Sequence, residues 1–289
     1  MRVYSRREFA QKTGLLSICA LGIGNLSAEK LRRENYVPGA IQKFHGWFCE
    51  NYHDFRKSLS KDELSFTNGA FECMDRNGSF SYAYERQLVF SNVSYSHKVT
   101  GATVNSSRMA VGSFVNPEFI VPSAKKCLEN RGIATDKIAD FDKTIGLGWD
   151  VDQGHIKVYI FNKSLDKTSD SEVKSMVNLY DDSSREKRFG CGLSSVTFKG
   201  KEVIEKKAYV VSRVPSDEVG FSARIKNKVY MLTTDRGVVP QYDLYPSYDI
   251  GQYLNPVGNS IVNKYREEIS TPVDTIAYKN NDDFTLYYP

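Results

Sequence analysis

The stretch "TIGLGWDVDQGHIKVYIFN", residues 144–162, has the pattern of a β-hairpin. Two runs rich in branched and aromatic residues flank a polar turn at residues 152–154, and that turn ends in glycine. Side chains two positions apart share one face of a strand. Lys157 and Tyr159 therefore point one way, and the apolar residues between and beside them point the other way.

The same order of lysine, apolar residue and tyrosine occurs twice more. It recurs as Lys207-Ala208-Tyr209 and as Lys228-Val229-Tyr230. If helices cover the apolar face of the sheet, the lysines and tyrosines face inward. The pattern also fits solvated cross-strand pairs on an exposed face, which strands commonly carry.

The hairpin pattern repeats along the chain, with segments of helical periodicity between the hairpins. Four further hairpins are expected at residues 71–90, 189–211, 219–234 and 275–288, with turns at residues 75–78, 199–201, 226–227 and 280–282. Helices are expected at about 39–60, 120–131, 170–180 and 256–269. We therefore predict an α+β protein, a ten-stranded antiparallel β-barrel built of five hairpins and surrounded by α-helices.

Composition narrows the function classes. The 289 residues carry a net charge of +4 without any run of basic residues, so we expect no nucleic-acid partner. No metal-ligand, dinucleotide, Walker or nucleophile-elbow motif is present in the sequence. With 40% hydrophobic residues, one domain over residues 29–289 is expected, and we expect it to be a monomer.

The N-terminal segment resembles a twin-arginine export signal. Arg6 and Arg7 precede a weakly apolar run that ends in small residues, which predicts removal of residues 1–28 and a periplasmic or secreted protein. The run is too short and interrupted to span a membrane, so no integral membrane segment is expected in the processed chain. The alternative is an amphipathic N-terminal helix on a cytoplasmic protein.

A barrel lined by lysines and tyrosines has a specific chemical use. Lysine and arginine bind a diphosphate through charge-assisted hydrogen bonds. Tyrosine rings stabilise an organic cation by cation–π attraction and exclude the water that would quench it. An enzyme that ionises an allylic diphosphate needs both.

The order of the hairpins, the three lysine–tyrosine strands and the C-terminal "DFTLYYP" resemble the ABBA-type prenyltransferases, with the cyanobactin peptide prenyltransferases nearest in pattern. The resemblance implies diphosphate-binding roles for Arg86, Lys157, Lys207 and Lys228, and Lys207 is the least regular of these positions. It implies cation shielding by Tyr159, Tyr209, Tyr230 and Tyr287. Glu72 falls where the family places an acid that accepts a proton, although an exposed strand carboxylate would look the same.

The resemblance implies prenyl transfer from a dimethylallyl-type diphosphate to an aromatic or other electron-rich acceptor, either a small molecule or a peptide. Mg²⁺ could share the diphosphate charge, but the sequence shows no ligand set for a metal. Isoprenyl diphosphates are made in the cytoplasm, which conflicts with export. The alternative is an exported, non-catalytic barrel that binds a small amphipathic ligand.

Overall fold

The computed structural model describes residues 60–61, 63, 92–100, 103–112, 117–150, 153–183, 188–189, 192–212, 225–234, 236–244, 254–268, 273, 275–280 and 283–288. The predictions for residues 1–28, the helix at 39–60, the hairpin at 71–90, Glu72 and Arg86 lie outside these residues. No helix in the described part of the chain is long and apolar enough to cross a membrane.

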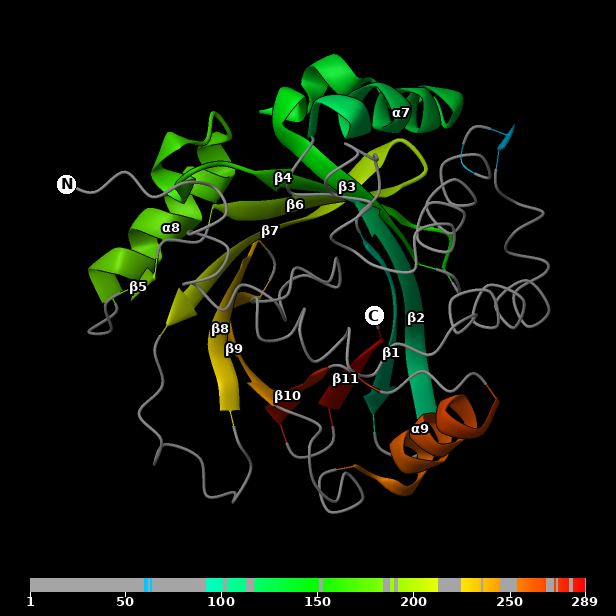
Figure 1. Ribbon diagram of the computed structural model, residues 1–289. Helices are drawn as coiled ribbons and strands as arrows, with labels where there is room; N and C mark the ends of the chain where they lie inside the picture. Colours follow the sequence, from blue (N-terminus) through cyan, green and yellow to red (C-terminus); the bar gives the residue numbers. More distant parts are fainter. Residues whose placement is uncertain are drawn as a thin grey trace.

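The described strands form one antiparallel sheet that curls into a ring (Figure 1). They are β1 (Asn92–Thr100), β2 (Thr103–Gly112), β3 (Thr144–Asp150), β4 (Ile156–Phe161), β5 (Arg188–Phe189), β6 (Leu193–Lys199), β7 (Glu202–Ser212), β8 (Ile225–Thr233), β9 (Gly237–Leu244), β10 (Thr275–Asn280) and β11 (Asp283–Tyr288). Their order is β5-β7-β6-β4-β3-β2-β1-β11-β10-β9-β8, and β7 also pairs with β8. That last pairing closes the sheet, which leaves only the two-residue β5 outside the ring.

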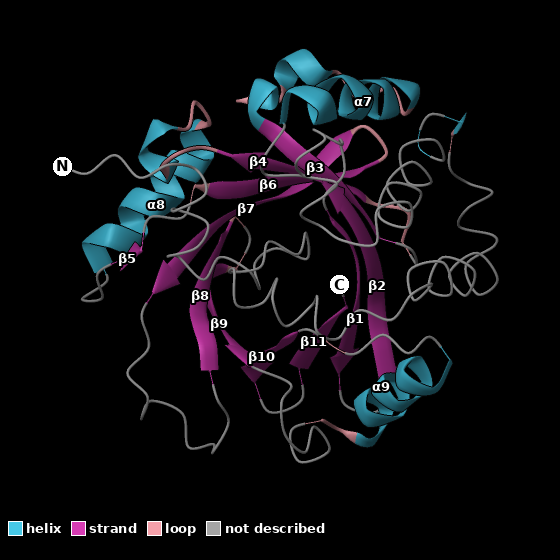
Figure 2. Cartoon of the chain, viewed as in Figure 1, coloured by secondary structure: helices cyan, strands magenta, loops and turns pink. Residues whose placement is uncertain are grey.

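In the described part of the chain, α-helices lie on the outside of the ring (Figure 2). They are α7 (Pro117–Asn130), α8 (Ser171–Ser183) and α9 (Pro256–Glu268), and short 3₁₀ turns lie at Thr135–Lys137, Phe141–Lys143 and Leu165–Lys167. The apolar side chains of α7 pack on the outward residues of β3, such as Leu147 and Trp149. Those of α8 pack on Ala208 and Val210 of β7 and Leu232 of β8. The main core therefore lies between sheet and helices, and the inner face of the sheet is left to form a lumen.

Hairpin turns gather at one end of the ring. The turns join β1 to β2, β3 to β4, β6 to β7, β8 to β9 and β10 to β11. Consecutive connections in an antiparallel ring lie at opposite ends, so these alternate connections share one end. Gly154, Gly200 and Gly237 stand in or beside these turns with φ of 68°, 59° and 68°, a backbone conformation that glycine adopts without steric cost. The helical connections lie at the other end.

The prediction of an antiparallel sheet that curls into a barrel is confirmed, but its detailed composition differs. The turn predicted at residues 226–227 is wrong, because β8 runs through these residues and turns after Thr233. The β1–β2 hairpin was not predicted. The turns at residues 152–154, 199–201 and 280–282 separate paired strands as expected.

Candidate functional site

A cavity of about 640 Å³ occupies the lumen near the hairpin-turn end. Nine charged side chains and one histidine line it: Lys98, Arg108, Asp150, His155, Lys157, Glu205, Lys207, Arg236, Lys279 and Asp283. Tyr159, Tyr209 and Tyr287 follow further along the same strands, and they belong to a cluster with buried apolar residues such as Val211 and Val229. Along these three strands the wall thus changes from charged, near the turns, to aromatic. Such a gradient suits a ligand with an anionic head and an apolar tail.

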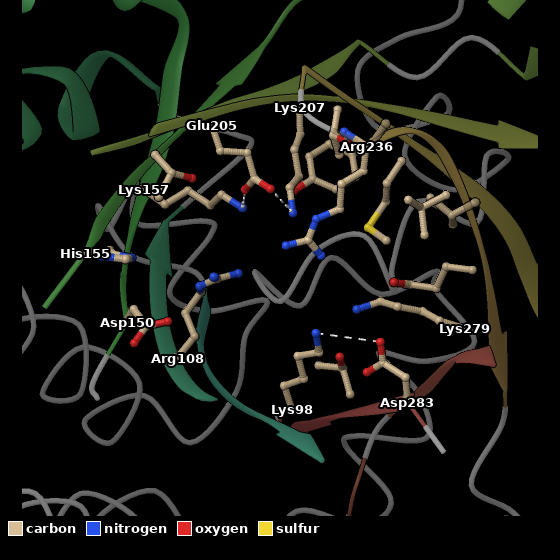
Figure 3. Close-up of a pocket in the computed structure, with 18 of the residues that line it drawn as sticks. Lys98, Arg108, Asp150, His155, Lys157, Glu205, Lys207, Arg236, Lys279 and Asp283 are labelled. Atoms are coloured by element: carbon tan, nitrogen blue, oxygen red, sulfur yellow. Dashed lines mark hydrogen bonds and ion pairs between the residues drawn. The ribbon is translucent and has the colours of Figure 1, made fainter. Parts of the chain in front are cut away.

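The cavity wall carries an excess of positive charge. Six cationic side chains face three carboxylates, which leaves three uncompensated positive charges when all are ionised. Four of the cations, with Asp150 and Glu205, form what we call the arginine–lysine cluster: Arg108 on β2, Lys157 on β4, Lys207 on β7 and Arg236 before β9. Figure 3 shows Lys157 and Lys207 on either side of Glu205, with Arg108 pointing into the same space.

Glu205 holds the two lysines of this cluster. Its Oε1 lies 2.9 Å from Lys207 Nζ and its Oε2 lies 3.9 Å from Lys157 Nζ. The side chain of Lys157 is only 2% exposed. Arg108 Nε is buried and has no hydrogen-bond partner among the residues that the structure describes. The Glu205 carboxylate therefore interacts with both lysines, and the Nε–H of Arg108 can still donate a hydrogen bond to a ligand.

Burial and the neighbouring charges together shift the pKa of Lys157, Lys207 and Glu205. Burial lowers the pKa of Lys157 well below its ordinary value, and the charges of Arg108 and Lys207 lower it further. Burial also lowers the pKa of Lys207, against the attraction of Glu205. The pKa of Glu205 is lowered, because the two lysines outweigh its burial. The charged forms of both lysines are thus disfavoured, and an additional anion nearby would stabilise them.

Arg108 stays charged in spite of its burial. Burial alone would lower its pKa, but Tyr159, Tyr209 and Asp150 raise it above the ordinary value. Burial raises the pKa of Tyr209 well above its ordinary value, and the Tyr159 phenol raises it further. Tyr209 therefore stays a neutral phenol, whose oxygen lies 3.3 Å from Ser195 Oγ. Lys157 Nζ lies 5.8 Å from the centroid of the Tyr159 ring, within the range of a cation–π contact.

Gly148 makes room for this arrangement on β3. A Cβ atom there would lie 3.1 Å from Tyr159 Cε2 and 3.4 Å from Arg108 Cδ. The first distance is tighter than an ordinary contact. The glycine of "GLGWD" therefore lets the ring and the arginine stem lie directly against the backbone of the neighbouring strand.

A second group of charges lies across the cavity from the arginine–lysine cluster (Figure 3). It consists of Lys98 on β1, Lys279 on β10 and Asp283 on β11, and we call it the Lys279 cluster. Lys98 Nζ lies 3.6 Å from Asp283 Oδ2. The pKa of Lys279 is lowered to about 8, mainly by burial. Asp283 raises this pKa, whereas the positive charges of Lys98, Lys207 and Arg108 lower it.

The structure brings together five of the residues predicted from the sequence. Lys157, Lys207, Tyr159, Tyr209 and Tyr287 all line the cavity. Their orientation is as expected, and their chemical roles remain predictions.

The predicted inward orientation of Lys228 and Tyr230 is wrong. Val229, Met231 and Thr233 are the residues of β8 that line the cavity, so Lys228 and Tyr230 lie on the outer face. The Tyr230 ring packs against Tyr180 of α8, with 5.2 Å between ring centroids. Lys228 Nζ lies over the Tyr230 ring at 5.1 Å. The physical reason is that β8 presents its apolar residues to the lumen, opposite to the pattern of β4 and β7.

Sequence reasoning missed Arg108, Glu205 and the Lys279 cluster. Arg108 lies on the hairpin that was not predicted, and a signal was present in the alternating Val and Thr residues around Gly101. Glu205 could have been found from Lys207, two positions away on the same face of a predicted strand. Lys279 and Asp283 flank the turn predicted at residues 280–282, but the sequence analysis did not single them out as candidate site residues.

Comparison with known proteins finds similarity in structure only. No protein-family model matches the chain, and no curated protein matches it either. The structure of 5-dimethylallyl tryptophan synthase from Streptomyces coelicolor in complex with DMASPP and Trp is 11% identical, with 88% of this chain and 94% of that chain covered and a TM-score of 0.44. Prenyltransferase PriB in ternary complex with L-tryptophan and dimethylallyl thiolodiphosphate is 10% identical, with 87% and 94% covered and a TM-score of 0.46.

The apo form of PriB is 12% identical to this chain, with 87% of this chain and 94% of that chain covered and a TM-score of 0.45. These three solved structures are of prenyltransferases, and the likeness concerns the fold. The finer resemblance to cyanobactin peptide prenyltransferases stays a prediction.

Proposed function

We propose that this chain transfers a prenyl group from an allylic, dimethylallyl-type diphosphate to an aromatic or other electron-rich acceptor, either a small molecule or a peptide. The observation that carries the proposal is the arginine–lysine cluster, which lies directly beside the tyrosines of the lumen. The cluster has an unbalanced positive charge, Lys157 is buried and Lys207 is largely covered. A diphosphate is an anion that supplies the missing charge.

The cluster would bind the diphosphate and stabilise it as a leaving group. Arg108 has a free Nε donor, and Lys157 and Lys207 each share a single carboxylate, so all three can donate to phosphate oxygens. When the bond between the allylic carbon and the diphosphate oxygen breaks, its electron pair leaves with the diphosphate. Preorganised cations in a buried site stabilise that developing charge more strongly than water does.

The tyrosines would stabilise the other product of the bond cleavage. The electron-rich faces of Tyr159, Tyr209 and Tyr287 attract an allyl cation, and the apolar residues next to them keep water away from it. Tyr209 stays protonated at neutral pH because burial raises its pKa. It therefore acts as a neutral ring and not as a phenolate nucleophile that would capture the prenyl group.

The acceptor would then attack the cation. A new bond forms between the acceptor and the allylic carbon, and the acceptor loses one proton to a base. Glu72 is the base that the sequence predicts, and Arg86 is a further predicted diphosphate ligand; both lie outside the described residues. Among the described residues, no group of three or more His, Cys, Asp or Glu could hold a metal ion. A role for Mg²⁺ stays an expectation.

A non-catalytic binding barrel is the second candidate, favoured by the same gradient from charged to aromatic wall and by the predicted export signal. It differs from the enzyme in one measurable property, because it would bind an amphipathic anion without turnover. Incubation of the full chain with dimethylallyl diphosphate and tryptophan- or tyrosine-containing peptides distinguishes the two. Prenylated peptide, detected by a mass increase, supports the enzyme.

Calorimetric titration of the full chain with a non-hydrolysable thio-analogue of dimethylallyl diphosphate tests the diphosphate site. We expect micromolar binding that weakens at least tenfold in Arg108→Leu and in Lys157→Met. Lys228→Met is the matched control, because Lys228 has the same sequence pattern but lies on the outer face. Folded protein that does not bind the analogue, or that loses binding in the control alone, would contradict the proposal.

A further inference from the structure

The Lys279 cluster lies on other strands than the charges that the proposed diphosphate site uses. Its members come from β1, β10 and β11, whereas the arginine–lysine cluster comes from β2, β3, β4, β7 and the turn before β9. In Figure 3 the side chains of Lys98, Lys279 and Asp283 point into the cavity from the wall opposite Lys157 and Glu205. The lumen therefore offers two charged subsites that face one another.

The charge of the Lys279 cluster matches a ligand with one negative charge. Its two lysines face one carboxylate, an excess of one positive charge. The arginine–lysine cluster has four cations and two carboxylates, an excess of two, and suits the more highly charged diphosphate. By this charge count, the lysines of the Lys279 cluster are not needed to balance a diphosphate at the arginine–lysine cluster.

Hydrogen-bonding groups in the Lys279 cluster are incompletely used. Asp283 Oδ2 has Lys98 Nζ at 3.6 Å, a loose ion pair. Asp283 Oδ1 is buried and has no hydrogen-bond partner among the residues that the structure describes. Buried polar atoms in proteins normally have partners, so an unused acceptor in a cavity wall indicates a ligand that donates. The subsite thus offers two cationic donors and one acceptor.

We propose that the Lys279 cluster binds the carboxylate of the acceptor, and that the acceptor is an aromatic carboxylic acid. The proposal rests on the proposed function and names the class of its second substrate. Lys279 and Lys98 donate to the carboxylate by charge-assisted hydrogen bonds. Asp283 Oδ1 accepts a hydrogen bond from an N–H or O–H group of the same molecule.

This placement puts the acceptor ring where the reaction needs it. Asp283 lies near the hairpin turn, and Tyr287 lies four residues further along the same face of β11, away from that turn. An acid anchored at the Lys279 cluster extends its ring toward Tyr287 and the other tyrosines. The allyl cation forms in that aromatic layer, so the anchored ring meets it there and the two negative groups remain on opposite walls.

Binding of three matched indoles to the full chain tests the proposal, with the diphosphate thio-analogue present at saturation. Indole-3-acetate carries a carboxylate, indole-3-acetamide is its neutral isostere, and tryptamine carries a positive charge instead. We expect indole-3-acetate to bind at least tenfold more tightly than the amide. We expect Lys279→Met to abolish this difference, and Lys199→Met to preserve it. Lys199 is an exposed lysine at the same end of the barrel and is not part of the cavity wall.

The other outcomes contradict the proposal. Equal binding of the acid and the amide, no binding of any of the three, or tightest binding of tryptamine each excludes a carboxylate subsite. A preference for the acid that survives in Lys279→Met places the carboxylate elsewhere. Analogue binding is measured separately in every variant. A loss of the acid preference with normal analogue binding concerns this subsite alone, and failure of analogue binding in the parent protein concerns the proposed function.

Discussion

Replacement of Lys157 by methionine should make the protein more stable and a weaker ligand binder. Lys157 is 2% exposed, and within the described part of the chain its one ion pair is the 3.9 Å contact with Glu205. Methionine has a similar volume and no charge to desolvate. Exchange of a buried ionic group for a well-packed apolar one is often neutral or stabilises by about 1–4 kcal/mol.

Glu205 does not lose its partner in this variant, which keeps the expected gain intact. Its Oε1 still accepts the hydrogen bond from Lys207 Nζ at 2.9 Å. The repulsion that Lys157 receives from Arg108 and Lys207 disappears. We therefore expect a gain of about 1–2 kcal/mol in the free energy of unfolding, which corresponds to a rise of about 2–8 °C in melting temperature.

Binding should change in the opposite direction. A hydrogen bond to a charged group contributes about 1.5–3 kcal/mol, so loss of the Lys157 ammonium should weaken the diphosphate analogue about 10- to 100-fold. Thermal melts and calorimetric titration of the same preparations measure both quantities.

Glu205→Gln provides the contrast for the Lys157 variant. It removes the carboxylate that two lysines share, and we expect a loss of about 1–3 kcal/mol in stability, below the full cost of breaking a buried pair because Glu205 is 18% exposed. A Lys157→Met protein that melts at a lower temperature than the parent, or that binds the analogue equally well, would refute the reasoning.

Three further variants test other parts of the structure. Glu63→Ala should destabilise by about 2–3 kcal/mol in urea titrations, because Glu63 Oε1 accepts hydrogen bonds from Trp149 Nε1 at 2.9 Å and from Arg131 Nε at 2.6 Å, and both are lost in the variant; an unchanged midpoint would contradict this. Gly148→Ala should weaken analogue binding and cost about 1–3 kcal/mol of stability, because its Cβ meets the Tyr159 ring at 3.1 Å; calorimetry and melting curves check both effects. Lys279→Met should flatten the rise of stability between pH 8 and pH 10.5, since the pKa of Lys279 is about 8 in the folded state against 10.5 in the unfolded state, so the unfolded chain binds more protons in that window. If stability, measured from urea midpoints across that range, rises equally steeply with pH in the parent and the variant, the expectation is contradicted.

Turn chemistry accounts for most of the fold that the sequence predicts. Gly154 and Gly200 adopt positive φ at turns that were placed correctly, because glycine there has a clear sequence pattern. The β8–β9 turn was misplaced for the opposite reason. Asn227 looks like a turn residue, but it pairs with Asp243 inside the strands, next to a register irregularity. The true turn precedes Gly237, which has a φ of 68°.

The position of a side chain on the inner or outer face depends on the layer that covers the strand. Lys157 and Lys207 face the lumen because the opposite residues of their strands pack under helices. On β8 the residues that alternate with Lys228 are apolar as well, so the period of two identifies the shared face without saying which way it points. Tertiary packing decides this, and here Tyr230 packs on Tyr180 of α8.

The distribution of charge separates a site for an anion from a merely polar lumen. A neutral amphipathic ligand would be served by hydroxyl and amide groups, which lose less solvation energy on burial than ammonium groups do. Instead burial, together with the charge of Arg108, lowers the pKa of both Lys157 and Lys207 in the lumen. This arrangement lowers the stability of the free protein, and only an anion of high charge relieves it. The tyrosine rings beside the cluster would stabilise positive charge on the carbon attached to that anion, because their faces attract cations. A site that stabilises an anion and a cation on adjacent parts of its wall is suited to separating one from the other.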